Sequence, residues 1–192
     1  MNVGWKLMTV VVIAMSGVQA SNTTCRTPPT APNYVNALYE GHWFEMGRSQ
    51  TPGGAALQVG CMCDVSDFVT DEPVQGNGTI SYVCRRFSPQ ADPVFANATL
   101  VDTGNPGEFK QVYPYPNSRP LNYYVIYIDE DSAVEYDCDT NDNGVTNYCV
   151  HILSRTATIA ADKEAALLQY AEDLGLNPDG IEYNPVQQEG CW

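Results

Sequence analysis

Hydrophobic and polar residues alternate in short runs along most of this chain, and segments rich in Gly, Pro, Asn and Asp separate the runs. Alternation with a period of two is typical of half-buried β-strands. Eight runs are therefore predicted as strands: His42–Gln50, Gln58–Val69, Gly78–Phe87, Val94–Asp102, Glu108–Tyr113, Leu121–Ile128, Ala133–Cys138 and Asn147–Ser154. Several of the intervening segments are hairpin-sized, which favours an antiparallel meander.

The pattern becomes helical once, after the eighth predicted strand. Good helix formers fill Asp162–Leu174, Ala161 and Asp162 offer an N-cap, and Gly175 is a stop signal. One apolar stripe on this helix must pack on another surface: Leu167, Leu168, Ala171 and Leu174. Eight sequential strands and one helix predict an all-β fold, an eight-stranded antiparallel up-and-down β-barrel with one C-terminal α-helix packed outside.

The first 20 residues have a pattern of their own. Lys6 precedes an apolar run from Leu7 to Met15, and Val18 and Ala20 give a small-x-small ending. This is the pattern of a secretory signal peptide, and the apolar run is too short to span a bilayer. We expect residues 1–20 to be removed and residues 21–192 to form a single secreted domain.

The charge of the chain limits its partners. It carries 23 acidic and 9 basic residues, a formal net charge of −14. Such a chain repels nucleic acid and anionic lipid surfaces, so we expect neither nucleic-acid binding nor membrane insertion. A homo-oligomer is left open.

Seven cysteines follow the predicted signal peptide, and export makes disulfides their expected state, with one cysteine left over. No metal site is predicted, because one residue separates Cys61 from Cys63 and both histidines stand alone. Residues 139–144 match the front of a calcium loop, but Val150 stands where a bidentate Glu belongs, so we interpret them as a hairpin turn. Three sequons are candidate glycosylation sites: Asn22, Asn77 and Asn97.

Three short motifs, in their order along the chain, resemble the signatures of the lipocalin family. Gly41–Trp43 resembles the Gly-x-Trp motif that opens the first strand, and Arg155 resembles the Arg that follows the last strand. Asp129–Asp131 keeps only the acidic character of the intervening Thr-Asp-Tyr turn. The segment Gln188–Cys191 resembles the tail of apolipoprotein D and its invertebrate relatives, which include pigment carriers.

The resemblance implies structural roles at a closed end of the barrel for Gly41, Trp43 and Arg155. A guanidinium over an indole face gains roughly 1–2 kcal/mol by cation–π attraction when desolvated. By analogy with the apolipoprotein D-like pattern, the expected disulfides are Cys25–Cys138 and Cys61–Cys191. Cys63 and Cys84 lie on neighbouring predicted strands, so a third bridge between them is left open, which would leave Cys149 free.

Side chains alternate between the inside and the outside of a barrel. This rule, applied from Trp43 and the expected bridges, gives a candidate ligand-binding set: His151, Arg85, Asp64, Glu135, Met62, Phe68, Tyr123 and Tyr127. The alternate face of the sixth strand, with Tyr124, Ile126 and Ile128, also fits the pattern. An apolar, aromatic hollow with a few polar anchors is the usual form of a small-molecule site.

These features predict a secreted carrier of a small hydrophobic ligand and not an enzyme. The resemblance favours a pigment as the bound chromophore, either a biliverdin-like tetrapyrrole (bilin) or a carotenoid, with no required cofactor. Carriers of retinoids, sterols or fatty acids stay open. The alternatives are an interaction role for the loops at the open end and a thiol-dependent enzyme such as a prostaglandin isomerase, for which Cys149 near His151 is the candidate thiol.

Overall fold

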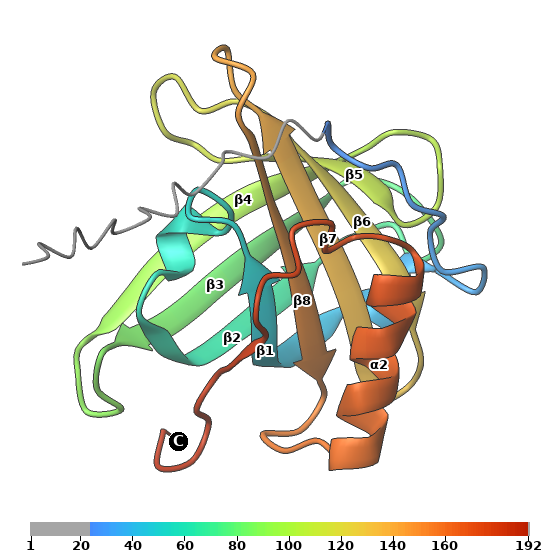
Figure 1. Ribbon diagram of the computed structural model, residues 1–192. Helices are drawn as coiled ribbons and strands as arrows, with labels where there is room; N and C mark the ends of the chain where they lie inside the picture. The colour runs from blue at the N-terminus through green and yellow to red at the C-terminus, as the bar shows by residue number, and fades with distance from the viewer. Residues whose placement is uncertain (1–23, 192) are drawn as a thin grey trace, which may run out of the picture.

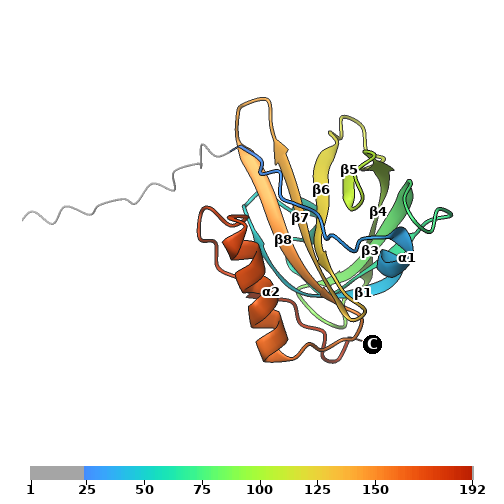
Figure 2. The same ribbon diagram turned by 90° about the vertical axis from the view of Figure 1, so that its right-hand side faces the viewer.

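A computed structural model describes residues 24–191 of the chain, so the predicted signal peptide and the Asn22 sequon lie outside the described residues. Strands wrap into a closed antiparallel barrel, and one long helix lies against its outer wall (Figures 1 and 2). The wall consists of β1 (Gly41–Gln50), β2 (Cys61–Val69), β3 (Gly78–Arg86), β4 (Pro93–Asp102), β5 (Glu108–Val112), β6 (Leu121–Ile128), β7 (Ser132–Thr140) and β8 (Thr146–Ser154). The remaining elements are α1 (Asn36–Tyr39), the 3₁₀ turn η1 (Ala56–Gln58), α2 (Ala161–Asp173) and the short β9 (Asn184–Pro185).

The strands pair in chain order from β2 to β8, and β1 closes the ring by pairing with both β8 and β2. The predicted meander and outer helix are confirmed, and most predicted strand ends are correct within two residues. The second strand was predicted too long, because η1 occupies its expected start at Gln58. Asn141 forms the predicted turn between β7 and β8, where its side-chain oxygen accepts the backbone N–H groups of Asn143 and Val145.

Two apolar clusters lie on opposite sides of the barrel wall. The inner one fills one end of the barrel around Trp43, Phe68 and Phe109. The outer one joins the far faces of β6, β7 and β8 to α2 through Leu167 and Ala171. The apolar stripe of the helix therefore packs as predicted, but residue 160 is the N-cap and no side chain caps the helix.

Trp43 and Arg155 close the end of the barrel filled by the inner cluster. The Trp43 side chain is fully buried, and its indole N–H donates to the carbonyl of Tyr39 at 2.8 Å. The guanidinium carbon of Arg155 lies 3.5 Å from the centre of the Trp43 ring, and its N–H groups donate to the carbonyls of Leu38, Glu40 and His42. The predicted barrel-closing pair is therefore present.

Three β-bulges interrupt the side-chain alternation of the wall. They lie in β1 between Glu45 and Gly47, in β2 between Met62 and Val65, and in β6 between Val125 and Tyr127. A bulge adds one residue to a strand and moves the following side chains to the other face. These three positions decide which residues reach the barrel interior.

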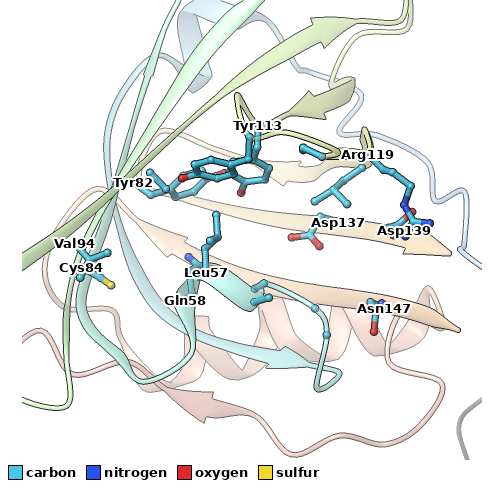
Figure 3. Close-up of a pocket in the computed structure, with 18 of the residues that line it drawn as sticks. Leu57, Gln58, Tyr82, Cys84, Val94, Tyr113, Arg119, Asp137, Asp139 and Asn147 are labelled. Carbon is cyan, nitrogen blue, oxygen red and sulfur yellow. Dashed lines mark hydrogen bonds and ion pairs between the residues drawn. The ribbon is translucent and has the colours of Figure 1, made fainter. Parts of the chain in front are cut away.

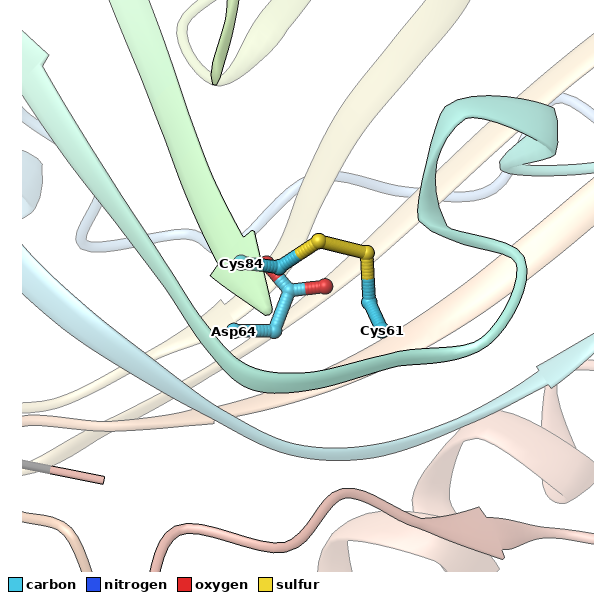
Figure 4. Close-up of side chains that lie close together, drawn as sticks. All are labelled: Cys61, Asp64 and Cys84. Carbon is cyan, nitrogen blue, oxygen red and sulfur yellow. A yellow bond between two sulfur atoms is a disulfide. The ribbon is translucent and has the colours of Figure 1, made fainter. Parts of the chain in front are cut away.

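The structure contains three disulfides, and two of them correct the expected pairing. Cys25–Cys138 is present as expected, whereas Cys61 pairs with Cys84 and Cys63 pairs with Cys191. The bulge in β2 explains the exchange, because Cys61 lies beside Cys84 and the Asp64 carboxyl on the inner side of the wall (Figure 4). Cys63, which has a positive φ of 55°, meets the C-terminal tail. Cys149 is free and buried, as favoured.

The tail also bridges the wall where β1 and β2 diverge. These strands pair only from Gly41 to Phe44, before the bulges. Beyond that point the side-chain amide of Gln188 donates to the backbone carbonyls of Glu45 and Asp64, both at 2.8 Å. The backbone N–H of Cys63 donates to the carbonyl of Gln187 at 2.7 Å. Residues 184–191 therefore act as a strap across the seam between the first two strands.

Candidate ligand cavity

A cavity of about 520 Å³ opens at the end of the barrel opposite Trp43 (Figure 3). Its mouth is bounded by residues 53–58 between β1 and β2, by the start of β4, and by residues 113–121 between β5 and β6. A hollow of this size falls in the range of small-molecule sites. Trp43 and the inner cluster fill the rest of the interior, so the hollow has one open end.

One wall of the cavity is aromatic and apolar. Tyr82 of β3 and Tyr113 are close neighbours in the wall, and Leu57 and Val94 also line the hollow (Figure 3). Gln111 donates to the Tyr82 hydroxyl at 2.6 Å, which fixes that ring. Burial raises the pKa of both tyrosines, so both phenols stay neutral at physiological pH. This wall suits a flat, uncharged surface.

The opposite wall carries a buried histidine held between two carboxylates. His151 of β8 places Nε2 2.9 Å from Asp137 and Nδ1 2.7 Å from Glu45. Burial alone would lower the pKa of His151, but Cys149, Glu45 and Asp137 together raise it well above 6.5. The raised pKa favours the imidazolium form between the two carboxylates, and the ring lines the cavity together with Asp137.

Arg48 is the second buried cation of the cavity floor. Its guanidinium donates to Glu45 and, at 3.2 Å, to Asp64. Burial would raise the pKa of Glu45, but Arg48 and His151 lower it to about 2, whereas burial and the Glu45 charge raise that of Asp64 well above 3.8. These opposite shifts favour the ionised form of Glu45 and the protonated form of Asp64, which limits the charge buried at this point.

Glu135 separates the polar floor from the apolar plug of the barrel. It accepts a hydrogen bond from the Tyr39 hydroxyl, which lies 2.7 Å from the hydroxyl of Tyr123. Burial raises the pKa of Glu135 despite the opposing effect of His151. The interior therefore has three layers from the base to the mouth: an aromatic plug, a hydrogen-bonded polar floor and an open cavity.

Comparison with known proteins supports the architecture. No family model and no curated protein matches the chain. Solved structures do: lobster apocrustacyanin A1 has 15% identity and a TM-score of 0.62, covering 80% of this chain and 79% of that one. Apocrustacyanins C2 and C1 have 16% and 17% identity and TM-scores of 0.63 and 0.61, each covering 83% of this chain and 81% of theirs. The chain has the lipocalin fold.

Of the predicted ligand residues, Asp64 and His151 line the cavity of this lipocalin barrel. Glu135 lies below them in the polar floor, and Phe68 and Tyr123 belong to the plug. Met62 is half-buried and outside the lining of the cavity.

Two predicted ligand residues point away from the interior. Arg85 donates to the carbonyl of Ala91, because the Cys61–Cys84 bridge turns Cys84 and its face of β3 inward instead. The bulge in β6 turns Tyr127 outward, where its ring packs against Tyr170 of α2 at 5.9 Å and its hydroxyl bonds to Asp129. Neither side chain can contact a ligand in the cavity.

Other residues of the interior were missed. Arg48 lies in the polar floor, outside the lining of the cavity, and it reaches the interior because of the β1 bulge, which nothing in the sequence marks. Tyr82 and Arg86 share the face of Cys84, so they follow from the corrected disulfide. Asp137 is two residues after Glu135 on β7, and simple alternation could have found it.

Two remaining predicted features lie on the surface. Asn77 and Asn97 are exposed, the first before β3 and the second within β4, so both sequons are accessible. Among residues 24–191, no helix combines the length and apolar character needed to cross a membrane.

Proposed function

We propose that this protein is a secreted member of the lipocalin family that carries a small, flat and largely hydrophobic molecule. The observation that carries the proposal is the cavity of about 520 Å³, open at one end and closed at the other by Trp43 and Arg155. A pigment fits this hollow, because the conjugated plane of a bilin or a carotenoid can lie on Tyr82 and Tyr113. The polar end of that ligand then meets Asp137 and His151.

Two further observations support this assignment. The solved structures of the same fold are named apocrustacyanins and described as apoproteins, that is, proteins lacking their bound group. Three disulfides among the described residues suit an oxidising compartment, which supports export. The pairing of Cys61 and Cys63 differs from the expected apolipoprotein D-like pattern, so that narrower relationship has less support than membership of the family.

The thiol-dependent enzyme is the less favoured function. Cys149 is completely buried, and burial raises the pKa of its thiol to about 12. Reactive cysteines need a lowered pKa and access to substrate, and Cys149 has neither. A carrier of retinoids, sterols or fatty acids is a variant of the proposal that the same experiment distinguishes.

The test is to purify the protein from its native source, record its visible spectrum and identify any extracted molecule by mass spectrometry. We expect a co-purifying conjugated molecule in about one copy per chain. The ligand-free recombinant protein is then titrated with biliverdin, a carotenoid, retinol and a fatty acid, and quenching of Trp and Tyr fluorescence is followed. A colourless native protein that binds none of these compounds contradicts the proposal.

A further inference from the structure

Three side chains with different metal-binding atoms converge on the cavity wall. Asp137 of β7 and Cys149 of β8 are cross-strand neighbours, and His151 follows Cys149 on the same inward face. One carboxylate oxygen, the thiol sulfur and one imidazole nitrogen all lie within 4.8 Å of one another. We propose that these three residues form a binding site for a divalent transition-metal ion of the zinc type.

The donor set and its spacing fit such an ion. Zn²⁺ accepts thiolate, imidazole and carboxylate ligands, and sites with three protein ligands leave the fourth position for water or another molecule. Bonds of about 2.0–2.3 Å in a tetrahedron hold ligand atoms roughly 3.3–3.8 Å apart. His151 Nε2 lies 2.9 Å from Asp137, whereas Cys149 Sγ lies 3.8 Å from the other ring nitrogen, Nδ1. The ligand atoms of the three residues lie within 4.8 Å of one another, so the ion requires the Cys149 side chain to turn toward Nε2.

Glu45 provides the support that a metal-binding histidine needs. Its Oε1 lies 2.7 Å from Nδ1 of His151, and Arg48 holds the other carboxylate oxygen. A ligating imidazole usually donates its second N–H to a carboxylate, which fixes the tautomer and the ring orientation. With Nδ1 held by Glu45, Nε2 on the Asp137 side is available to the ion. The ion takes the place of the proton between Nε2 and Asp137, and the Cys149 thiol releases its own proton to solvent when it binds as thiolate.

The site has an entry path and an open side. Asp137 and His151 line the cavity, whereas Cys149 is completely buried behind them. An ion can therefore enter from the mouth and keep its fourth position facing the cavity. A second buried group of this kind within residues 24–191, formed by Cys61, Asp64 and Cys84, lacks this capacity because its two sulfurs are joined in a disulfide (Figure 4).

The test is titration of the mature, disulfide-bonded protein with Co²⁺, which has visible bands in tetrahedral sites and a charge-transfer band when bound to thiolate. We expect one Co²⁺ per chain, both spectral features, and displacement by one equivalent of Zn²⁺. Cys149→Ser removes the charge-transfer band, and Glu45→Gln weakens binding roughly 10- to 100-fold. His42→Gln is the matched control, since His42 is half-exposed on β1 and bonded to Asp67; its spectrum and affinity stay those of the native protein.

Folding of each variant is checked by circular dichroism. If Cys149→Ser does not fold, anomalous diffraction from zinc-soaked crystals of the native protein locates the ion without any substitution. Absence of the charge-transfer band in the folded native protein overturns the proposal. So does a band that survives in folded Cys149→Ser, or a zinc ion located away from these three side chains. None of these readouts requires the organic ligand of the cavity, so this site and the carrier function are tested separately.

Discussion

The guanidinium carbon of Arg155 lies 3.5 Å from the centre of the Trp43 indole ring. Its N–H groups simultaneously satisfy three backbone carbonyls around α1, at distances of 2.7 to 2.9 Å. Arg155 therefore does two things at once: it covers the indole, and it ties the end of β8 to the segment that enters β1.

We predict that Arg155→Ala lowers the free energy of unfolding by about 1–3 kcal/mol, because it removes both the cation–π contact and these hydrogen bonds. Arg155→Lys keeps the charge but loses the planar guanidinium and its hydrogen bonds. Its free energy of unfolding is therefore expected between that of Arg155→Ala and that of the native protein. Urea denaturation measures both variants. Arg119→Ala is the control, since Arg119 forms a partly exposed pair with Asp139 and its loss changes stability by less than about 1 kcal/mol. Equal effects at the two arginines would contradict the role of Arg155.

The corrected disulfides differ in the length of chain that they enclose. Cys63–Cys191 spans 128 residues and Cys61–Cys84 spans 23. In the chain-entropy description the longer loop stabilises by about 1.5 kcal/mol more. We predict that the double serine variant of the Cys63–Cys191 pair loses more stability than that of Cys61–Cys84, as measured by thermal unfolding under oxidising conditions. Peptide mapping of the intact protein checks the pairing itself, and a fragment joining Cys61 to Cys191 would refute it.

His151 makes stability dependent on pH. Its folded pKa lies well above the unfolded value near 6.5, so its stabilising contribution is complete below about pH 6.5 and is lost as the pH rises through the folded pKa. The pKa values of Asp64 and Glu135 are also raised in the folded state, so the stability that these two groups contribute also falls as the pH rises, starting from a lower pH. We predict that the melting temperature falls between pH 6.5 and 9.

His151→Gln removes most of this fall, whereas His42→Gln leaves it unchanged, because His42 is half-exposed and lies outside the barrel. Calorimetry at a series of pH values makes the comparison. The same slope in the native protein and in His151→Gln would show that the imidazole carries no charge in the folded state.

The cavity wall predicts which tyrosines matter for the ligand. Tyr113 lines the hollow, whereas Tyr127 packs under α2 on the outside. Tyr113→Leu is expected to weaken ligand binding by about 0.5–1.5 kcal/mol, the loss of one aromatic stacking contact. Tyr127→Leu is the matched control and leaves binding unchanged. His151→Ala is expected to shift the absorbance of a bound chromophore, and an unchanged spectrum would place His151 outside the contact surface.

The architecture followed from the sequence because each strand keeps its period of two over several residues and each turn carries its own breakers. The residues that face the barrel interior were predicted less accurately from the sequence. Arg48 and Tyr127 each come just after a bulge, and an extra residue in a strand leaves no trace in the hydrophobic pattern. The inside–outside alternation of side chains therefore predicts the correct face up to a bulge and the opposite face after it.

The expected disulfide pairing also led to a wrong prediction of which side chains face inward. A bridge from Cys61 to the tail leaves Cys63 to pair with Cys84 on the outer face, and that arrangement predicts Arg85 on the inner face. In the structure the short bridge between β2 and β3 is internal, so Tyr82 and Arg86 replace the predicted neighbours. One wrong pairing thus exchanged the two faces of a whole strand.

The strap formed by residues 184–191 has a consequence for biogenesis. It is synthesised more than a hundred residues after the two strands whose seam it spans, through Gln188 and Cys191. The seam between β1 and β2 therefore cannot be bridged until nearly the whole chain has been translated. The disulfide that closes this side cannot form before Cys191 has been translated, and a chain that ends before residue 184 leaves the carbonyls of Glu45 and Asp64 without their Gln188 partner.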